Sequence, residues 1–118
     1  MKLLHNVKLA IAEDHQFYRE GLIARLKQES GIDIVGQFEN GRVLLDFLKT
    51  NAVEVVLMDI TMPVMNGVEA TRYLAENYPA VKVIALTMFD DDNSIIEMLE
   101  AGAKGYLLKN TEFNEMLT

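Results

Sequence analysis

Several residue types that often define a class of protein are missing from this chain of 118 residues. It has no cysteine, which excludes a disulfide framework, a thiolate zinc site and a cysteine nucleophile. No apolar run approaches the ~20 residues that span a bilayer, and the first residues lack the apolar stretch of a secretory signal. We therefore expect a soluble, cytoplasmic protein.

Basic side chains are also scarce: 11 Lys and Arg stand against 18 Asp and Glu, a formal net charge of −7. Nucleic acids are bound chiefly by neutralising phosphates with Lys and Arg, so we expect this domain itself to bind neither DNA nor anionic membrane. Half of the residues are hydrophobic, enough for the core of one domain. The surplus of carboxylates makes their positions informative.

The hydrophobic pattern alternates regularly between two periods. Short runs rich in Val and Ile predict five strands at residues 7–12, 32–38, 54–58, 81–87 and 104–108. Between them, apolar residues three and four positions apart predict amphipathic helices around residues 18–26, 43–48, 68–75 and 95–103. Asn-Gly pairs beginning at Asn40 and Asn66 precede two of these helices, and Gly102 stands where a helix should end.

Alternating strands and helices imply an α/β fold, with a parallel sheet covered by helices on both faces. We predict a doubly wound, five-stranded, flavodoxin-like (βα)5 sheet with strand order 2-1-3-4-5. Ligands bind such sheets beyond the carboxyl ends of the strands, where strands 1 and 3 are neighbours. The polar residues at these ends are Glu13, Asp14, Asp59, Thr87 and Lys109, which we expect to share one crevice.

Three neighbouring carboxylates raise one another's pKa unless a cation joins them. Mg²⁺ suits oxygen ligands, and we expect no imidazole at the site, because His15 should begin the first helix with its ring facing solvent. We assign Asp14 to direct coordination of Mg²⁺ and Glu13 to an outer, water-mediated contact.

With Mg²⁺ and Lys109 present, such a site is near neutral and could receive a phosphoryl group. A carboxylate can attack phosphorus and form an aspartyl phosphate, while a metal ion and a lysine neutralise the transferred oxygens. Asp59 is the best candidate for the nucleophile, because it stands alone after its strand. Thr87 could donate its hydroxyl to the phosphoryl group.

Five short motifs carry a resemblance to a known family: Ala-Glu-Asp-His at 12–15, Arg-Glu-Gly-Leu at 19–22, Leu-Met-Asp-Ile-Thr-Met-Pro at 57–63 followed by Asn66-Gly67, Ala-Leu-Thr at 85–87, and Ala-Gly-Ala-Lys-Gly-Tyr-Leu-Leu-Lys at 101–109. From residue 7 to about residue 114 the sequence resembles a response regulator receiver domain of two-component signalling. The resemblance implies that Asp59 accepts phosphate from a sensor histidine kinase or a small phosphodonor such as acetyl phosphate. It implies no turnover of a metabolite, so we do not expect an enzyme in the usual sense.

The resemblance also implies roles for other residues. Asp14, Asp59 and the backbone carbonyl of Thr61 would hold Mg²⁺, with Glu13 assisting, and Lys109 would contact the phosphoryl group. Thr87 would move toward that group after transfer. Tyr106 would rotate and alter the surface formed by the fourth helix, fifth strand and fifth helix, which could serve as a homodimer surface.

The residues in these motifs are most similar to those of receivers joined to a LuxR-type helix-turn-helix output domain. We therefore expect residues 1–118 to be the receiver of a transcription regulator whose DNA contacts belong to an output domain that is missing here. The fifth helix should begin near Thr111 and stop at Thr118, which suggests truncation. Glu13 replaces a common aspartate, and Asn110 replaces a common proline, so we expect a trans peptide after Lys109.

Two other functions stay open. A receiver-like module could bind partners without phosphate, although the full set of acid, hydroxyl and amine positions argues against this. A phosphatase of the haloacid dehalogenase type would also use an aspartyl phosphate, but Asp59-Ile60-Thr61 lacks the second aspartate of the Asp-x-Asp motif that this resemblance would call for.

Overall fold

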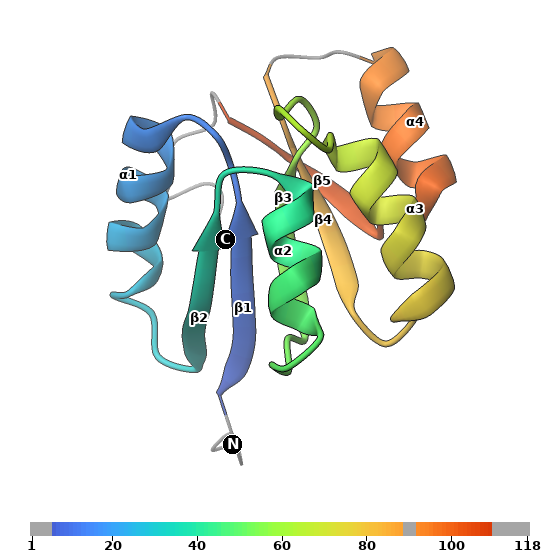
Figure 1. The fold of residues 1–118 in the computed structure, drawn as a ribbon. Coiled ribbons are helices and arrows are strands. Elements are labelled where there is room, and N and C mark those ends of the chain that lie inside the picture. The colour runs from blue at the N-terminus through green and yellow to red at the C-terminus, as the bar shows by residue number, and fades with distance from the viewer. Residues whose placement is uncertain (1–5, 89–91, 110–118) are drawn as a thin grey trace.

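The computed structural model describes residues 6–88 and 92–109 of the chain. Strands and helices alternate along them (Figure 1), in the order β1 (Val7–Ala12), α1 (Gln16–Leu26), β2 (Ile32–Phe38), α2 (Gly41–Leu48), β3 (Val55–Asp59), α3 (Gly67–Asn77), β4 (Lys82–Thr87), α4 (Asp92–Ala101) and β5 (Gly105–Leu108). Each element matches a predicted segment, and β3, β4 and β5 begin one residue later than predicted. None of the helices in the described part is long and apolar enough to cross a membrane.

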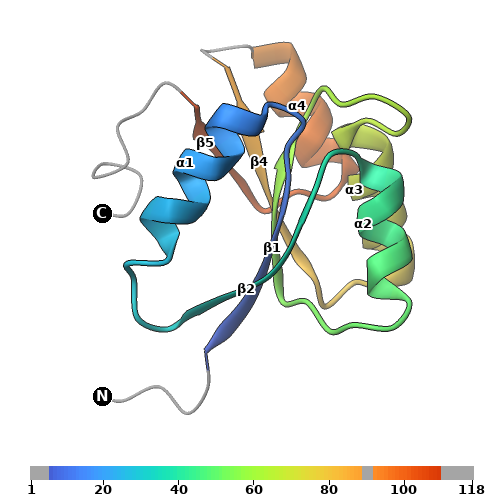
Figure 2. The same ribbon diagram turned by 60° about the vertical axis from the view of Figure 1, so that its left-hand side comes forward.

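The five strands form one parallel sheet in the order β2-β1-β3-β4-β5, which confirms the predicted topology. Figure 2 shows α1 on one face of the sheet and α2, α3 and α4 on the other. Alternate residues of β1 divide between the two layers, since Leu9 and Ile11 pack with α1 while Ala10 and Ala12 pack with the opposite core. Burial on both faces explains why the strands are almost continuous apolar runs.

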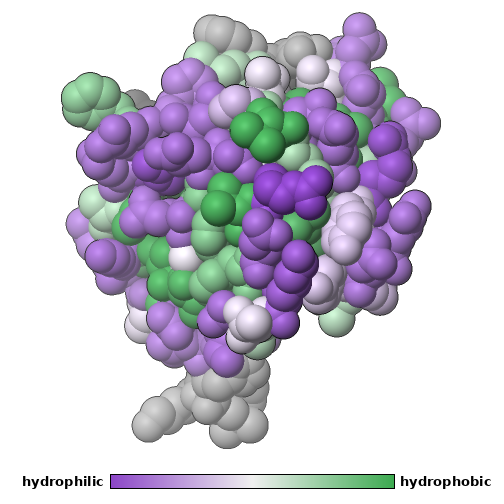
Figure 3. All heavy atoms as spheres, in the orientation of Figure 1, coloured by the Kyte–Doolittle hydropathy of each residue, from purple (hydrophilic) through white to green (hydrophobic). Residues whose placement is uncertain are grey.

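The edge strand β2 is an exception to this double burial. Most of its residues are only half-buried, and hydrophobic side chains reach the surface around it between α1 and α2 (Figure 3). The inner strands β1, β3 and β4 therefore carry most of the core, and they also place the polar residues at their carboxyl ends.

Local signals set the helix boundaries. The Asn40 side chain accepts a hydrogen bond from the Val43 N–H at 3.1 Å, and Asn66 forms a reciprocal capping box with Glu69. Gly102, directly after α4, has a φ of 125°, which favours glycine. The predicted helix starts at both Asn-Gly pairs are confirmed. The predicted fifth helix and the Lys109–Asn110 peptide lie outside the described residues.

Candidate functional site

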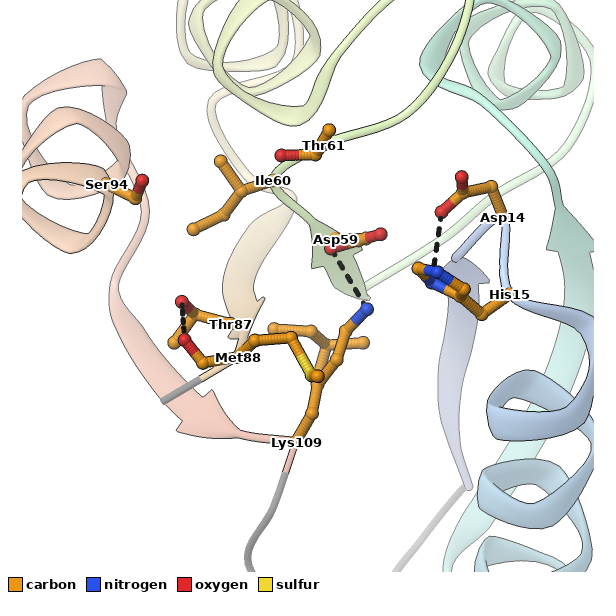
Figure 4. A pocket seen from close by; sticks show the side chains of 10 residues that line it. Asp14, His15, Asp59, Ile60, Thr61, Thr87, Met88, Ser94 and Lys109 are labelled. Carbon is orange, nitrogen blue, oxygen red and sulfur yellow. Dashed lines mark hydrogen bonds and ion pairs between the residues drawn. The ribbon is translucent and has the colours of Figure 1, made fainter. Parts of the chain in front are cut away.

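The carboxyl ends of β1, β3, β4 and β5 surround a cavity of about 320 Å³. Five of the residues singled out in the sequence line it: Asp14, Asp59, Thr61, Thr87 and Lys109. Figure 4 shows the Lys109 side chain reaching Asp59 from the end of β5, with Asp14 and His15 facing Asp59 from the end of β1. The parallel sheet thus brings together residues from both ends of the chain, as its topology predicts.

Asp59 is the last residue of β3, and its side chain is only 7 % exposed. Its Oδ1 lies 3.2 Å from the Lys109 ammonium, while its Oδ2 is buried without a hydrogen-bond partner among the described residues. Burial, followed by the negative charge of Glu13, raises the pKa of Asp59 to about 7, although Lys109 acts in the opposite direction. A buried carboxylate with one unsatisfied oxygen is a group that a cation would stabilise.

Glu13 does not line the cavity, and its side chain is fully buried. Its Oε1 lies 2.5 Å from the Lys109 ammonium, whereas the Oδ1 of Asp59 lies 3.2 Å from the same ammonium. Its Oε2 accepts a hydrogen bond from the His15 backbone N–H at 2.9 Å. Glu13 is therefore bound to two other parts of the protein, one at the start of α1 and one at the end of β5.

His15 precedes α1 as its N-cap residue, and its ring is 69 % exposed, in line with the sequence-based expectation of a solvent-facing ring. Its Nδ1 nevertheless lies 3.1 Å from Glu13 Oε2 and 3.5 Å from Asp14 Oδ1. The expectation that no imidazole stands at the site is therefore wrong. The ring is directed to these carboxylates because the N-cap position places it over the end of β1.

Four residues form a potential metal site. Glu13, Asp14, His15 and Asp59 each offer one ligand atom, and these atoms all lie within 4.8 Å of one another. Three of the four donors are carboxylates, which hard divalent cations prefer, and each of the three has an oxygen that is buried without a hydrogen-bond partner among the described residues. The donor set therefore fits a divalent cation.

The remaining predicted residues occupy different surroundings. Thr87 is 3 % exposed, and its hydroxyl donates a long, 3.5 Å hydrogen bond to the carbonyl of Met88. Tyr106, on β5, is 47 % exposed and pairs in register with Ala85. Thr87 thus faces the cavity, whereas the Tyr106 ring reaches solvent.

Two residues of α1 support the site without having been predicted. Arg19 is buried, and it donates to the Glu13 carbonyl at 2.6 Å and to the Gln37 side chain at 3.1 Å. The Tyr18 ring centroid lies 5.2 Å from the Lys109 ammonium. A signal for Arg19 was present, because it stands three residues before Leu22 on the apolar face of a predicted helix.

Comparison with known proteins agrees with this geometry. Residues 9–118 match the family described as the response regulator receiver domain. The chain belongs to this family. Its homologues are LuxR/NarL-type response regulators of two-component systems, and the predicted flavodoxin-like receiver fold is confirmed.

Two curated relatives illustrate the similarity. The chain is 38 % identical over 113 residues to the transcriptional regulatory protein DegU of Brevibacillus brevis, covering 96 % of this chain and 48 % of DegU. It is 42 % identical over 104 residues to LnrK of Bacillus subtilis, covering 88 % of this chain and 47 % of LnrK. This receiver domain thus spans about half the length of the curated relatives it matches.

Solved receiver structures have the same fold. The signal receiver domain of NarL from Mycobacterium tuberculosis superposes with a TM-score of 0.88 at 26 % identity, covering 96 % of this chain and 91 % of that one. The non-phosphorylated receiver of RcsB from Escherichia coli gives a TM-score of 0.84 at 26 % identity, with the same two coverages.

Proposed function

We propose that this receiver domain is a signalling switch that accepts a phosphoryl group on Asp59 in a Mg²⁺-dependent reaction. The observation that carries the proposal is the state of the Asp59 carboxylate, which has one oxygen beside the Lys109 ammonium and the other buried without a partner among the described residues. A phosphoryl group and a cation would satisfy both needs. The natural donor would be the phosphohistidine of a sensor kinase.

In the transfer step, an ionised oxygen of Asp59 forms a bond to phosphorus while the phosphorus–nitrogen bond of the donor breaks. The leaving imidazole keeps the electron pair and takes a proton from solvent. The Lys109 ammonium stabilises charge on the phosphoryl oxygens, and the Thr87 hydroxyl, whose hydrogen bond to Met88 is long at 3.5 Å, can turn to donate to one of them.

Asp14, Asp59 and the backbone carbonyl of Thr61 would hold the Mg²⁺ ion, which when bound supplies positive charge to the phosphoryl oxygens. The Asp14 side chain is 30 % exposed, and both Asp14 and Thr61 line the cavity. Glu13, which also offers an oxygen within 4.8 Å of the other donors, would assist the ion through water.

The wider role follows from the family. We propose that residues 1–118 form the receiver of a cytoplasmic transcription regulator, and that phosphorylation changes the surface around α4 and β5 through Tyr106. RcsB, a structural relative, has been observed as dimers bound to DNA. A homodimer through this surface and the fifth helix, and DNA contact through a separate output domain, are therefore part of the proposal. The domain would turn over no metabolite.

Intact-mass analysis after incubation with acetyl phosphate and Mg²⁺ tests the proposal. We expect a mass increase of one phosphoryl group, its loss in Asp59→Asn, and a higher Mg²⁺ requirement in Asp14→Ala. Asp46→Asn, which removes an exposed carboxylate on α2, serves as the matched control and should be modified like the wild type. If no adduct forms and beryllium fluoride does not bind, the phosphate-independent module is correct; steady phosphate release from phosphomonoesters would indicate a phosphatase.

A further inference from the structure

We infer that His15 is a direct ligand for a transition cation of the Zn²⁺ class, which competes with Mg²⁺ for the candidate metal site. The His15 imidazole would bind this cation together with the carboxylates of Glu13, Asp14 and Asp59. Mg²⁺ takes oxygen ligands, whereas imidazole suits Zn²⁺ and its neighbours in the first transition row. The imidazole that the sequence did not lead us to expect at the site therefore adds a second class of cation to those the cavity can hold.

The orientation of the His15 ring is not explained by the helix that follows it. His15 is the N-cap residue of α1, yet its side chain makes no capping hydrogen bond. Figure 4 shows the ring beside Asp14 and facing Asp59, at the edge of the cavity. The ring is thus turned away from the backbone of its own helix and toward the acids that follow β1 and β3.

The acids beside the ring have oxygens that the protein leaves unsatisfied. Asp14 Oδ1 and Asp59 Oδ2 are buried without a hydrogen-bond partner among the described residues, and the Asp59 side chain is only 7 % exposed. The hydrogen bond between the His15 ring and Glu13 uses Glu13 Oε2, so it satisfies neither of these two oxygens. A cation bonded to the acids would satisfy both, and the His15 ring offers that cation a nitrogen.

The separations between the donor atoms are those of ligands around one small cation. With bonds of about 2.1 Å from Zn²⁺ to nitrogen or oxygen, neighbouring ligand atoms of a tetrahedral shell lie about 3.4 Å apart. The His15 Nδ1 lies 3.1 Å from Glu13 Oε2 and 3.5 Å from Asp14 Oδ1, on either side of this value. All four donors lie within 4.8 Å of one another, so the widest gap closes by about 1.4 Å or less when the shell forms.

A fourth protein ligand changes what the site can do. Zn²⁺ held by four protein ligands has a closed tetrahedral shell, whereas catalytic sites keep one position open. Mg²⁺ is held by fewer protein groups and keeps positions for waters and a phosphate oxygen. Zn²⁺ should therefore occupy the cavity and prevent Asp59 from receiving a phosphoryl group. This consequence rests on the proposed function, but the binding of Zn²⁺ by His15 does not.

The first test follows the histidine rings of the wild-type protein by ¹⁵N NMR. Stoichiometric Zn²⁺ should shift the ring nitrogen resonances of His15 by far more than saturating Mg²⁺ does, because only Zn²⁺ would bond to the ring. His5, the other histidine of the chain, is the internal control and should respond to neither cation. A His15 response to Zn²⁺ no larger than that to Mg²⁺, or a Zn²⁺ response confined to His5, would overturn the inference.

The second test compares the affinities for the two cations by calorimetry. His15→Ala should lower Zn²⁺ affinity at least about tenfold and change Mg²⁺ affinity less than about threefold, since loss of even an indirect metal contact costs about ten- to a hundredfold. His5→Ala is the matched control and should bind both cations like the wild type. If amide spectra show that His15→Ala does not fold, His15→Asn supplies a good N-cap without an imidazole. Unchanged Zn²⁺ affinity, or an equal loss for both cations, in a folded His15 variant would refute the inference.

A third test measures phosphorylation by intact-mass analysis in acetyl phosphate and Mg²⁺. Added Zn²⁺ should suppress the phosphoryl adduct of the wild type, and at least about tenfold more Zn²⁺ should be needed for the same suppression in His15→Ala. An adduct that saturating Zn²⁺ leaves unchanged would overturn the competition with Mg²⁺. If the wild type forms no adduct even without Zn²⁺, the proposed function fails, whereas the ¹⁵N and calorimetric results still decide whether His15 is a ligand.

Discussion

Replacing Asp59 with asparagine should stabilise the protein, and by an amount that grows with pH. The pKa of Asp59 is raised from its ordinary value of 3.8 to about 7. Between about pH 4 and about pH 7 the folded protein therefore binds more protons than the unfolded chain, so ionisation of Asp59 lowers stability as pH rises through this window. Above the window the full cost, about 4 kcal/mol at 1.36 kcal/mol per pKa unit, is present.

The free-energy cost of ionising Asp59 can be separated from the other changes in stability that the Asp59→Asn substitution causes. Asparagine also loses the charged contact with Lys109, but that attraction is already included in the pKa of Asp59, which Lys109 lowers. From the two pKa values, the advantage of Asp59→Asn should increase by about 2 kcal/mol between about pH 5.5 and about pH 8.5. The change with pH is therefore the diagnostic quantity.

Urea unfolding followed by far-UV circular dichroism, in EDTA at both pH values, measures this quantity; the chain has no tryptophan to report by fluorescence. Asp46→Asn, with its exposed carboxylate, should show no such growth. Adding Mg²⁺ at the higher pH should stabilise the wild type more than Asp59→Asn, because binding to the folded state adds to its stability. An equal difference at both pH values would refute the assignment of a raised pKa to Asp59.

Three further predictions concern the segment that joins β3 to α3. Gly67→Ala should destabilise by at least about 3 kcal/mol in urea unfolding, because a Cβ there would lie 2.1 Å from the Asp59 carbonyl oxygen; a well-folded variant would contradict this. Val64→Gly should raise the free energy of unfolding by about 1 kcal/mol, because Val64 has a φ of 67° and an 81 % exposed side chain that packs little; an unchanged or lower value would argue against strain. Asn66→Ala should cost about 1 kcal/mol through loss of the capping box, and a matching loss in Glu69→Ala, with partial non-additivity in the double variant, would support that cause.

The fold could be predicted because its signals are local and repeated. Runs of Val and Ile alternate with helical spacing, so element type and order follow from periodicity, and the parallel topology then fixes which strand ends meet. Strands β3, β4 and β5 begin one residue later than predicted because a strand begins and ends where its pairing with a neighbouring strand does, which the sequence of one strand does not record. Asp59 is an example, because it pairs in register with Leu86 and so belongs to the strand it was expected to follow.

The site was predicted only as a set of neighbours. Which acid pairs with Lys109 depends on differences of about an ångström between side-chain ends, and no spacing rule separates Glu13 from Asp59 at that level. The ring of His15 and the guanidinium of Arg19 were missed as partners of Glu13 for a similar reason. Hydrogen bonds between residues of different elements depend on helix orientation, which is set by the packed core.

The Glu13–Lys109 ion pair joins positions near opposite ends of the described chain. A contact of such large sequence separation forms late in folding, because most of the loop between its partners must first be ordered. On a ribosome, a growing chain that has buried its β1 and β3 residues therefore still lacks the Glu13–Lys109 ion pair until β5 has emerged.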